Sequence, residues 1–217
     1  MATLIPQGIR VGTGMDQRDN NRRQFLRRSI QTGLTFFCGW MPASTRAMEP
    51  DRVKQEPEAA RFKDDGAIPN SRYPALIYRS AFAEPSAAKV EQYFASLNWT
   101  NSWKNGIYPF HHYHSTSHEA LGVYSGSATV RLGGEQGRDF QIKAGDVIVI
   151  PAGVGHKNLG SSGDFGVVGA YPDGRSWDLL RGKPGERPQA DDNIARLPVP
   201  TTDPVGGAQG RLRELWV

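Results

Sequence analysis

Histidines are concentrated in one short segment of this 217-residue chain. Four of its five histidines lie between residues 111 and 118, directly before Glu119, and the fifth is His156. Chance placement would scatter five histidines along the chain. Imidazole and carboxylate groups at short spacing are ligands that divalent transition metals prefer in proteins. The segment therefore predicts a metal site.

The alternation of side chains along an extended segment indicates which histidines share a face. On a strand over residues 107–114, His112 and His114 lie on one face and His111 lies on the other. After a turn, Glu119 adds a carboxylate at the start of the next strand. His112 and His114 can therefore bind one ion together, with Glu119 as a further ligand.

A second segment returns a histidine toward this pair. An apolar strand over residues 146–150 ends at Pro151, and glycines before His156 allow the chain to turn sharply. We therefore expect His156 to lie close to His112 and His114.

Short strands separated by glycine-rich turns position these segments. An earlier strand is expected over residues 73–82, and a helix is expected after Ser86, which can cap it. Strands at this spacing predict an all-β sandwich or small barrel. The later candidate strands cover residues 107–114, 119–125, 127–132, 139–142, 146–150, 156–159 and 165–171. The apolar residues of the helix at helical spacing are Val90, Tyr93, Phe94 and Leu97.

The two histidine segments resemble the two motifs of the cupin superfamily. Gly106, His112, His114, Glu119 and Gly126 match the first motif, G-x5-H-x-H-x4-E-x6-G. Gly145, Pro151, Gly153 and His156 match the second motif, G-x5-P-x-G-x2-H. The Asn that usually stands four residues after the last histidine is replaced by Gly160, and in the family this Asn is not a metal ligand. The run over residues 111–119 and the later 169–172 further resemble the small bacterial YjlB-type subgroup.

The resemblance implies a fold and a ligand set. It implies a single cupin jelly-roll barrel (a double-stranded β-helix) over residues 71–171, with short flanking helices. It also implies a divalent metal held by His112, His114, Glu119 and His156. Three neutral imidazoles and one carboxylate leave such an ion a net charge of about +1, and about two open coordination positions if its coordination is octahedral. Mn²⁺ or Fe²⁺ is favoured, and the same ligands accept Ni²⁺, Co²⁺ or Zn²⁺.

Two classes of function follow from such a site. The first is an enzyme of the oxidase, dioxygenase, decarboxylase or isomerase type that acts on a small molecule. The second is a module that binds a small molecule or a metal without catalysis. The sequence identifies neither a catalytic acid or base nor a substrate.

Other residues near the motifs are expected to be structural. We expect His111 and His118 at the surface or in an interface, with His118 pointing away from the metal, although either could orient a ligand from behind. Tyr108, Phe110 and Tyr171 could line a pocket, but their expected role is to fill the barrel.

The N-terminal segment resembles a twin-arginine export signal. Residues 21–27, Asn-Arg-Arg-Gln-Phe-Leu-Arg, keep the arginine pair and the Phe-Leu of that pattern, and a mildly apolar stretch follows. Small residues allow cleavage after Ala47. We expect residues 1–47 to be a signal peptide, with Met15 as an alternative start. The alternative to a signal peptide is an amphipathic or disordered basic tail. Export would involve the twin-arginine translocase and place the protein in the periplasm or outside the cell.

Charge and cysteine content limit the partners. Residues 1–47 contain seven arginines and two aspartates, a net charge of +5, so the remainder of this +4 chain carries −1 and a nucleic-acid partner is not expected. The apolar stretch is too short and polar for a permanent membrane span. Cys38 is the only cysteine, so the cleaved chain can form no internal disulfide.

Two segments flank the expected barrel. Residues 48–70 are expected to form a linker or an N-terminal arm, and residues 172–217 a C-terminal extension that packs on the barrel. The resemblance implies that such an arm can be exchanged between subunits of a homodimer.

Overall fold

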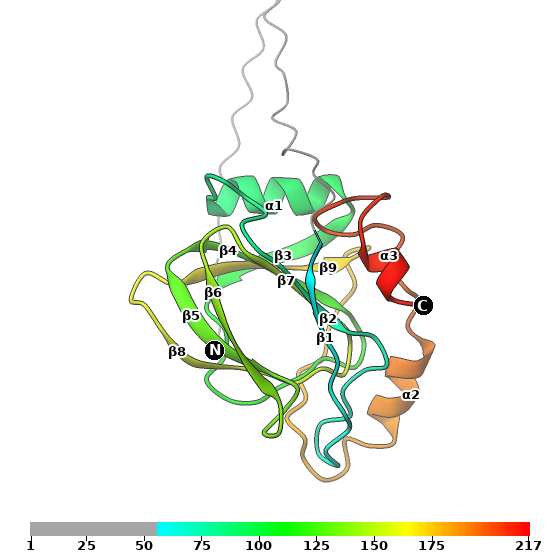
Figure 1. The fold of residues 1–217 in the computed structure, drawn as a ribbon. Coiled ribbons are helices and arrows are strands. Elements are labelled where there is room, and N and C mark those ends of the chain that lie inside the picture. Colours follow the sequence, from blue (N-terminus) through cyan, green and yellow to red (C-terminus); the bar gives the residue numbers. More distant parts are fainter. Residues whose placement is uncertain (1–55) are drawn as a thin grey trace, which may run out of the picture. The chain divides into compact units, whose positions relative to one another are not determined.

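Two antiparallel β-sheets face each other in the computed structural model, which describes residues 56–217 (Figure 1). The twin-arginine signal expected at residues 1–47 lies outside the described residues. In spatial order, the six-stranded sheet contains β1 (Glu58–Ala60), β2 (Ala75–Tyr78), β7 (Val147–Ile150), β4 (Glu119–Ser125), β9 (Gly166–Pro172) and β3 (Trp99–Asn105). The three-stranded sheet contains β6 (Arg138–Lys143), β5 (Ser127–Leu132) and β8 (His156–Ser161).

The space between the two sheets is filled by a first apolar core. On β4, Leu121 and Val123 point into it. On β5, Val130 and Leu132 point into the core from the other sheet, and Arg131 between them is partly exposed. This alternation is typical of a sheet with one buried face. The all-β prediction with a jelly-roll barrel is confirmed.

A second apolar core covers the outer face of the six-stranded sheet. It explains why all four residues of β7 are buried, because Ile148 faces the first core while Val147 and Val149 face the second. The helix α1 (Ala87–Ser96) packs on β3, β4 and β9 with Val90 and Phe94 fully buried. Its expected cap is confirmed, since Ser86 Oγ accepts a hydrogen bond from Lys89 N at 3.3 Å.

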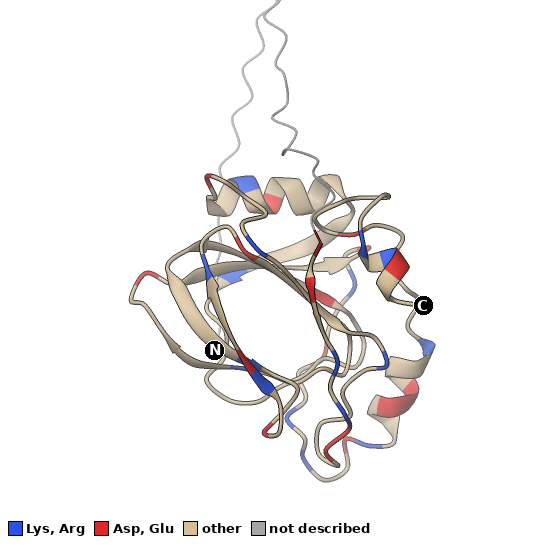
Figure 2. Cartoon of the chain, viewed as in Figure 1, with Lys and Arg blue, Asp and Glu red and all other residues tan. Residues whose placement is uncertain are grey.

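The C-terminal segment contributes two more short helices to the outside of the barrel. They are α2 (Gln189–Arg196) and α3 (Leu212–Leu215), and Figure 1 shows both on the side of β1 and β2. Leu212 and Trp216 are buried in the second core. No helix among residues 56–217 is long and apolar enough to cross a membrane. Figure 2 shows that acidic and basic residues are interspersed along the helices and strands of this part.

The predicted strand over residues 107–114 does not form, and the structure has an unpredicted strand, β3, just before it. Within 107–114, His112 pairs with His156 and the next residue, Tyr113, pairs with Leu180, so no continuous ladder forms. Pro109 also lacks the N–H that a central strand would need. The sequence pattern does not reveal strand β3, because it is an edge strand with polar residues and a bulge between Thr100 and Trp103.

Candidate metal centre

Three histidines from the two motif segments meet at one end of the barrel. His112, His114 and His156 each offer a ring nitrogen, and these atoms lie within 4.8 Å of one another. All three side chains are buried. The backbones of His112 and His156 are also joined directly, because each N–H donates to the other's carbonyl, at 3.2 and 2.9 Å. The predicted convergence of His156 with His112 and His114 is thus present in the structure.

A tight turn between β7 and β8 returns His156 to the pair. Gly153 has a φ of +91°, and a Cβ at this position would lie 2.3 Å from the carbonyl oxygen of Asn70. Only glycine meets both demands without strain. The turn is fixed from the other side by the bond from Gly153 N to His114 O at 2.8 Å. The glycine of the second motif therefore sets the position of His156 through the backbone.

The histidine rings are oriented from behind by backbone carbonyls. The Nδ1 of His112 lies 3.2 Å from Phe110 O, that of His156 lies 3.3 Å from Val154 O, and that of His114 contacts Asp178 O. A carbonyl only accepts hydrogen bonds, so each Nδ1 carries a proton, and in the neutral form of each ring the Nε2 lone pair is free. This is the tautomer that metal ligation requires.

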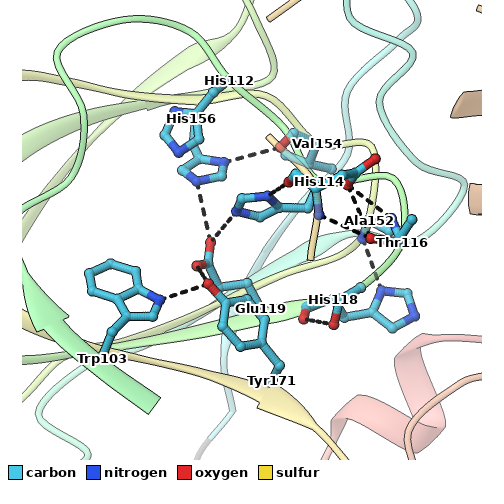
Figure 3. Close-up of polar contacts among 12 residues, drawn as sticks. Trp103, His112, His114, Thr116, His118, Glu119, Ala152, Val154, His156 and Tyr171 are labelled. Carbon is cyan, nitrogen blue, oxygen red and sulfur yellow. Dashed lines mark hydrogen bonds and ion pairs between the residues drawn. The ribbon is translucent and has the colours of Figure 1, made fainter. Parts of the chain in front are cut away.

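The Glu119 carboxylate completes the cluster at the first residue of β4. Its Oε2 lies 3.5 Å from His114 Nε2 and 3.3 Å from His156 Nε2 (Figure 3). This oxygen is fully buried and accepts no hydrogen bond of good geometry. Burial alone would raise the pKa of Glu119, but the His114 and His156 imidazoles hold it well below its usual range. The carboxylate is therefore charged inside the protein.

These groups fit a divalent cation. Nitrogen lone pairs and an oxygen without a donor face one small space, and a buried carboxylate in that position is costly unless a cation pairs with it. Burial lowers the pKa of His112 to about 2, with help from the neighbouring His156, so this imidazole is neutral and ready to bind. The residues present would hold the metal through three Nε2 atoms and Glu119 Oε2.

The other oxygen of Glu119 is held by an aromatic pair. Tyr171 on β9 donates from its hydroxyl to Glu119 Oε1 at 2.9 Å, and Trp103 Nε1 donates to the same hydroxyl at 2.7 Å (Figure 3). Gly169 makes room for the indole, because a Cβ there would lie 2.2 Å from Trp103 Cε2. This chain of hydrogen bonds fixes the carboxylate so that Oε2 faces the histidines.

A strap of the C-terminal segment, residues 176–180, closes the site beside His114. The Asp178 carboxylate accepts hydrogen bonds from Ser115 N at 2.6 Å and Thr116 N at 3.2 Å, and from both hydroxyls. Its neighbour Trp177 lies edge-on to His114, with ring centroids 5.0 Å apart. The strap therefore holds the loop between His114 and Glu119 and also borders the site.

Comparisons with known proteins identify the family. Residues 103–164 match the Cupin domain family. The uncharacterized protein YjlB of Bacillus subtilis (strain 168) is 42% identical over 166 residues, which cover 76% of this chain and 99% of YjlB. The chain belongs to the cupin superfamily.

Solved structures of low sequence identity resemble parts of this cupin. A DUF861 family protein from Thermotoga maritima is 22% identical, with a TM-score of 0.28, and the match covers 45% of this chain and 96% of that protein. Oxalate decarboxylase from Bacillus subtilis is 20% identical, with a TM-score of 0.32, and the match covers 50% of this chain and 28% of the decarboxylase.

The cavity of this cupin lies above the four candidate ligands. It has a volume of about 440 Å³ and is lined by His112, His114, Glu119 and His156 together with residues of β3, β9 and the strap. Tyr108 and Tyr171 are among the lining residues, so the expectation that they only fill the barrel is wrong. A larger hollow of about 770 Å³, bordered by β5 and β6, contains none of these residues.

The prediction that His118 lies at the surface is wrong. His118 is buried, and its Nδ1 accepts from Ala152 N at 2.9 Å while its Nε2 lies 3.3 Å from Pro198 O. Its ring packs on Trp216, with centroids 4.8 Å apart. As expected, it points away from the three clustered histidines (Figure 3). His118 thus connects the second-motif turn to the C-terminal segment.

His111 also lies outside the cluster, as its parity predicts. Its side chain is only 12% exposed, and its Nε2 lies 3.2 Å from Glu135 Oε1.

Trp103, Trp177 and Asp178 were not predicted as site residues. Two of them belong to the strap, and their only signal in the sequence is a short aromatic and acidic stretch beyond the last barrel strand.

Proposed function

We propose that this cupin is a metal-dependent enzyme that acts on a small molecule at a mononuclear site formed by His112, His114, Glu119 and His156. The observation that carries the proposal is the arrangement of the donors: three Nε2 lone pairs and one unbonded carboxylate oxygen border a cavity of about 440 Å³. A protein that only stored metal would not need such a cavity beside its metal ligands. Pockets of this size accommodate small ligands.

The metal that we propose is Mn²⁺ or Fe²⁺, because the site mixes imidazole with a hard carboxylate and contains no thiolate. Bound there, the ion would act as a Lewis acid with open positions for an anionic substrate. The protein's own groups supply the rest. The carbonyls behind the histidines hold the Nδ1 protons, so that in the neutral rings the Nε2 lone pairs are free for the metal, and the Tyr171 hydroxyl fixes Glu119.

Metal analysis combined with a substrate panel tests this proposal. Protein purified from its native compartment should contain about one equivalent of metal, and a variant with His112→Ala and His114→Ala should contain much less. Equal metal content in the two proteins would refute the site. Oxygen uptake or CO₂ release with small carboxylates and phenols should then appear only in the metal-loaded protein. A loaded protein that is silent throughout but binds one of these compounds would favour a binding module instead.

We also propose that the protein reaches the periplasm or the exterior through the twin-arginine translocase. The proposal rests on the sequence of residues 21–47 and on the metal site, since this route carries folded proteins and a metal could be inserted before export. A reporter that is exported only when folded, fused after residues 15–60, should be exported. The same fusion with Arg22→Lys and Arg23→Lys should stay inside, and unchanged export would refute the assignment.

A further inference from the structure

Two aromatic rings in the lining of the cavity contact the candidate metal ligands. The ring of Tyr108 lies edge-on to His112 at a centroid distance of 5.2 Å. The ring of Trp177 lies edge-on to His114 at 5.0 Å. Each ring therefore contacts a different metal-ligand histidine and stands next to the place where a metal-bound molecule would lie.

Both rings are supported from behind. Tyr108 stacks on Phe110 with centroids 4.9 Å apart, and the Arg181 guanidinium lies 4.0 Å from the Phe110 ring centroid. Trp177 stacks on Tyr171 at 5.7 Å. Aromatic walls held in this way lose little conformational entropy when a ligand binds.

The same two rings are unusually open to solvent. Tyr108 is 46% exposed and Trp177 is 37% exposed, although most large apolar side chains of the described residues are buried. Partly exposed aromatic faces at the mouth of a cavity are typical of ligand sites, because a flat apolar ligand can cover them.

The charges around the cavity indicate where an anionic group would bind. Among the described residues that line the cavity, Lys104 is the only lysine or arginine, and its Nζ is paired with Glu91 Oε2 at 2.5 Å. A free guanidinium that could bind a carboxylate is thus absent from this lining. The metal, with a net charge of about +1 in this ligand set, is the remaining partner for an anion.

We propose that this site binds a single-ring aromatic carboxylate, with the carboxylate on the metal and the ring packed against Tyr108 and Trp177. The inference rests on the metal-dependent function proposed above and specifies its class of substrate. The two oxygens of one carboxylate can take two neighbouring open positions, and a single ring fits a cavity of about 440 Å³.

Benzoate and cyclohexanecarboxylate form a matched pair of probes, because they have the same charge and number of heavy atoms but only benzoate is aromatic. Titration calorimetry with the Mn²⁺-loaded protein should show benzoate binding about tenfold more tightly. The variants Tyr108→Leu and Trp177→Leu should reduce this preference to about twofold. Leu179→Ala is the control, since Leu179 belongs to the same strap and is 39% exposed but does not line the cavity. It should keep the full preference.

Metal content, measured on the same samples, separates two kinds of failure. A fully loaded protein that binds the two probes equally, or binds neither at millimolar concentration, would overturn the aromatic assignment and leave the metal centre intact. Loss of benzoate preference in Leu179→Ala as well as in the cavity variants would also overturn it. A protein that cannot be loaded with Mn²⁺ would overturn the metal-dependent function, and this inference with it.

Discussion

At the scale of single residues, Glu119 carries a buried negative charge that a bound cation would compensate. One carboxylate oxygen is satisfied by the Tyr171 hydroxyl, while the other is buried without a hydrogen-bond donor. In a metal-free protein, His114 is the group that can compensate it. Burial alone would lower the pKa of His114, but the Glu119 carboxylate and the Asp178 carbonyl raise it above its usual value. A proton on His114 and a metal bound in the cluster would therefore compete for the same place.

Replacing Glu119 by Gln should abolish tight metal binding. The amide keeps the size of the side chain but removes the negative charge that the divalent ion needs. Because loss of a supporting residue near a metal already costs about 10–100-fold in affinity, loss of this ligand should cost at least about 100-fold. Competition with a chelator measures the Mn²⁺ affinity. Glu135→Gln, at an exposed glutamate next to His111, is the matched control and should bind as the wild type does. Equal affinities in all three proteins would remove Glu119 from the ligand set.

The competition between proton and metal predicts the pH dependence. Metal binding requires the unprotonated form of His114, and its raised pKa means that protonation begins at a higher pH than for an ordinary histidine. As the pH falls through that value, Mn²⁺ affinity should decrease by about tenfold per unit for the one proton displaced. Chelator competition between pH 5 and 9 tests this. An affinity that is constant down to pH 5 would contradict the assignment of His114.

At the scale of elements, the strap over residues 176–180 fixes the loop between His114 and Glu119 although it is not a strand of the barrel. Its Asp178 carboxylate accepts hydrogen bonds from the backbone and hydroxyls of Ser115 and Thr116, and its Asp178 carbonyl accepts a hydrogen bond from His114 Nδ1. The strap lies beyond the residues that match the Cupin domain family. The loop that carries two of the candidate ligands is therefore fixed by a segment that the family motifs do not contain.

Replacing Asp178 by Ala should weaken both stability and metal binding. The variant leaves two backbone N–H groups in the loop without their acceptor, which should cost about 2–4 kcal/mol of unfolding free energy, since hydrogen bonds to a charged group are the stronger kind. Mn²⁺ affinity should fall about 10–100-fold as His114 loses its fixed position. Urea denaturation and chelator competition measure the two effects. Asp192→Ala, on the exposed face of α2, should change neither. Wild-type metal affinity in Asp178→Ala would show that the strap does not position the site.

The sequence was informative wherever a side chain's role depended on its near neighbours. The motif spacing predicted which histidines converge, and parity placed His111 outside the cluster although residues 107–114 form no strand. That parity survives because His112 and Tyr113 are each bridged to a different partner, His156 and Leu180, on opposite sides of the chain. Side chains can therefore alternate between the two faces of an extended segment that forms no continuous β-ladder.

Residues whose roles depend on distant contacts could not be predicted. His118 is buried because Trp216 and Pro198 cover it, and Tyr171 reaches Glu119 only because β9 lies beside β4. Trp177 is next to His114 through the same kind of long-range packing. Each of these contacts joins positions far apart in the chain, and no local pattern of apolar or polar residues encodes such a pairing.

At the scale of the whole molecule, the candidate centre joins segments that are distant in sequence. Glu119 begins β4 of the six-stranded sheet, His156 begins β8 of the three-stranded sheet, and Asp178 belongs to the C-terminal segment. A metal bound here would contact both sheets at once. Since the unfolded chain cannot keep these ligands together, metal binding should stabilise the folded protein as a whole.

Metal removal should therefore lower the melting temperature of the entire domain. A metal present at about 100 times its Kd stabilises the folded state by about 2.7 kcal/mol, which corresponds to about 5–10 °C in a domain of this size. Thermal unfolding of the Mn²⁺-loaded protein, followed by circular dichroism with and without EDTA, measures the shift. The variant with His112→Ala and His114→Ala provides the control, and its melting temperature should be insensitive to EDTA. If EDTA strips the metal from the wild type and the melting temperature does not change, the ion is not bound between the two sheets. An equal shift in the double variant would place the stabilising metal at some site other than this one.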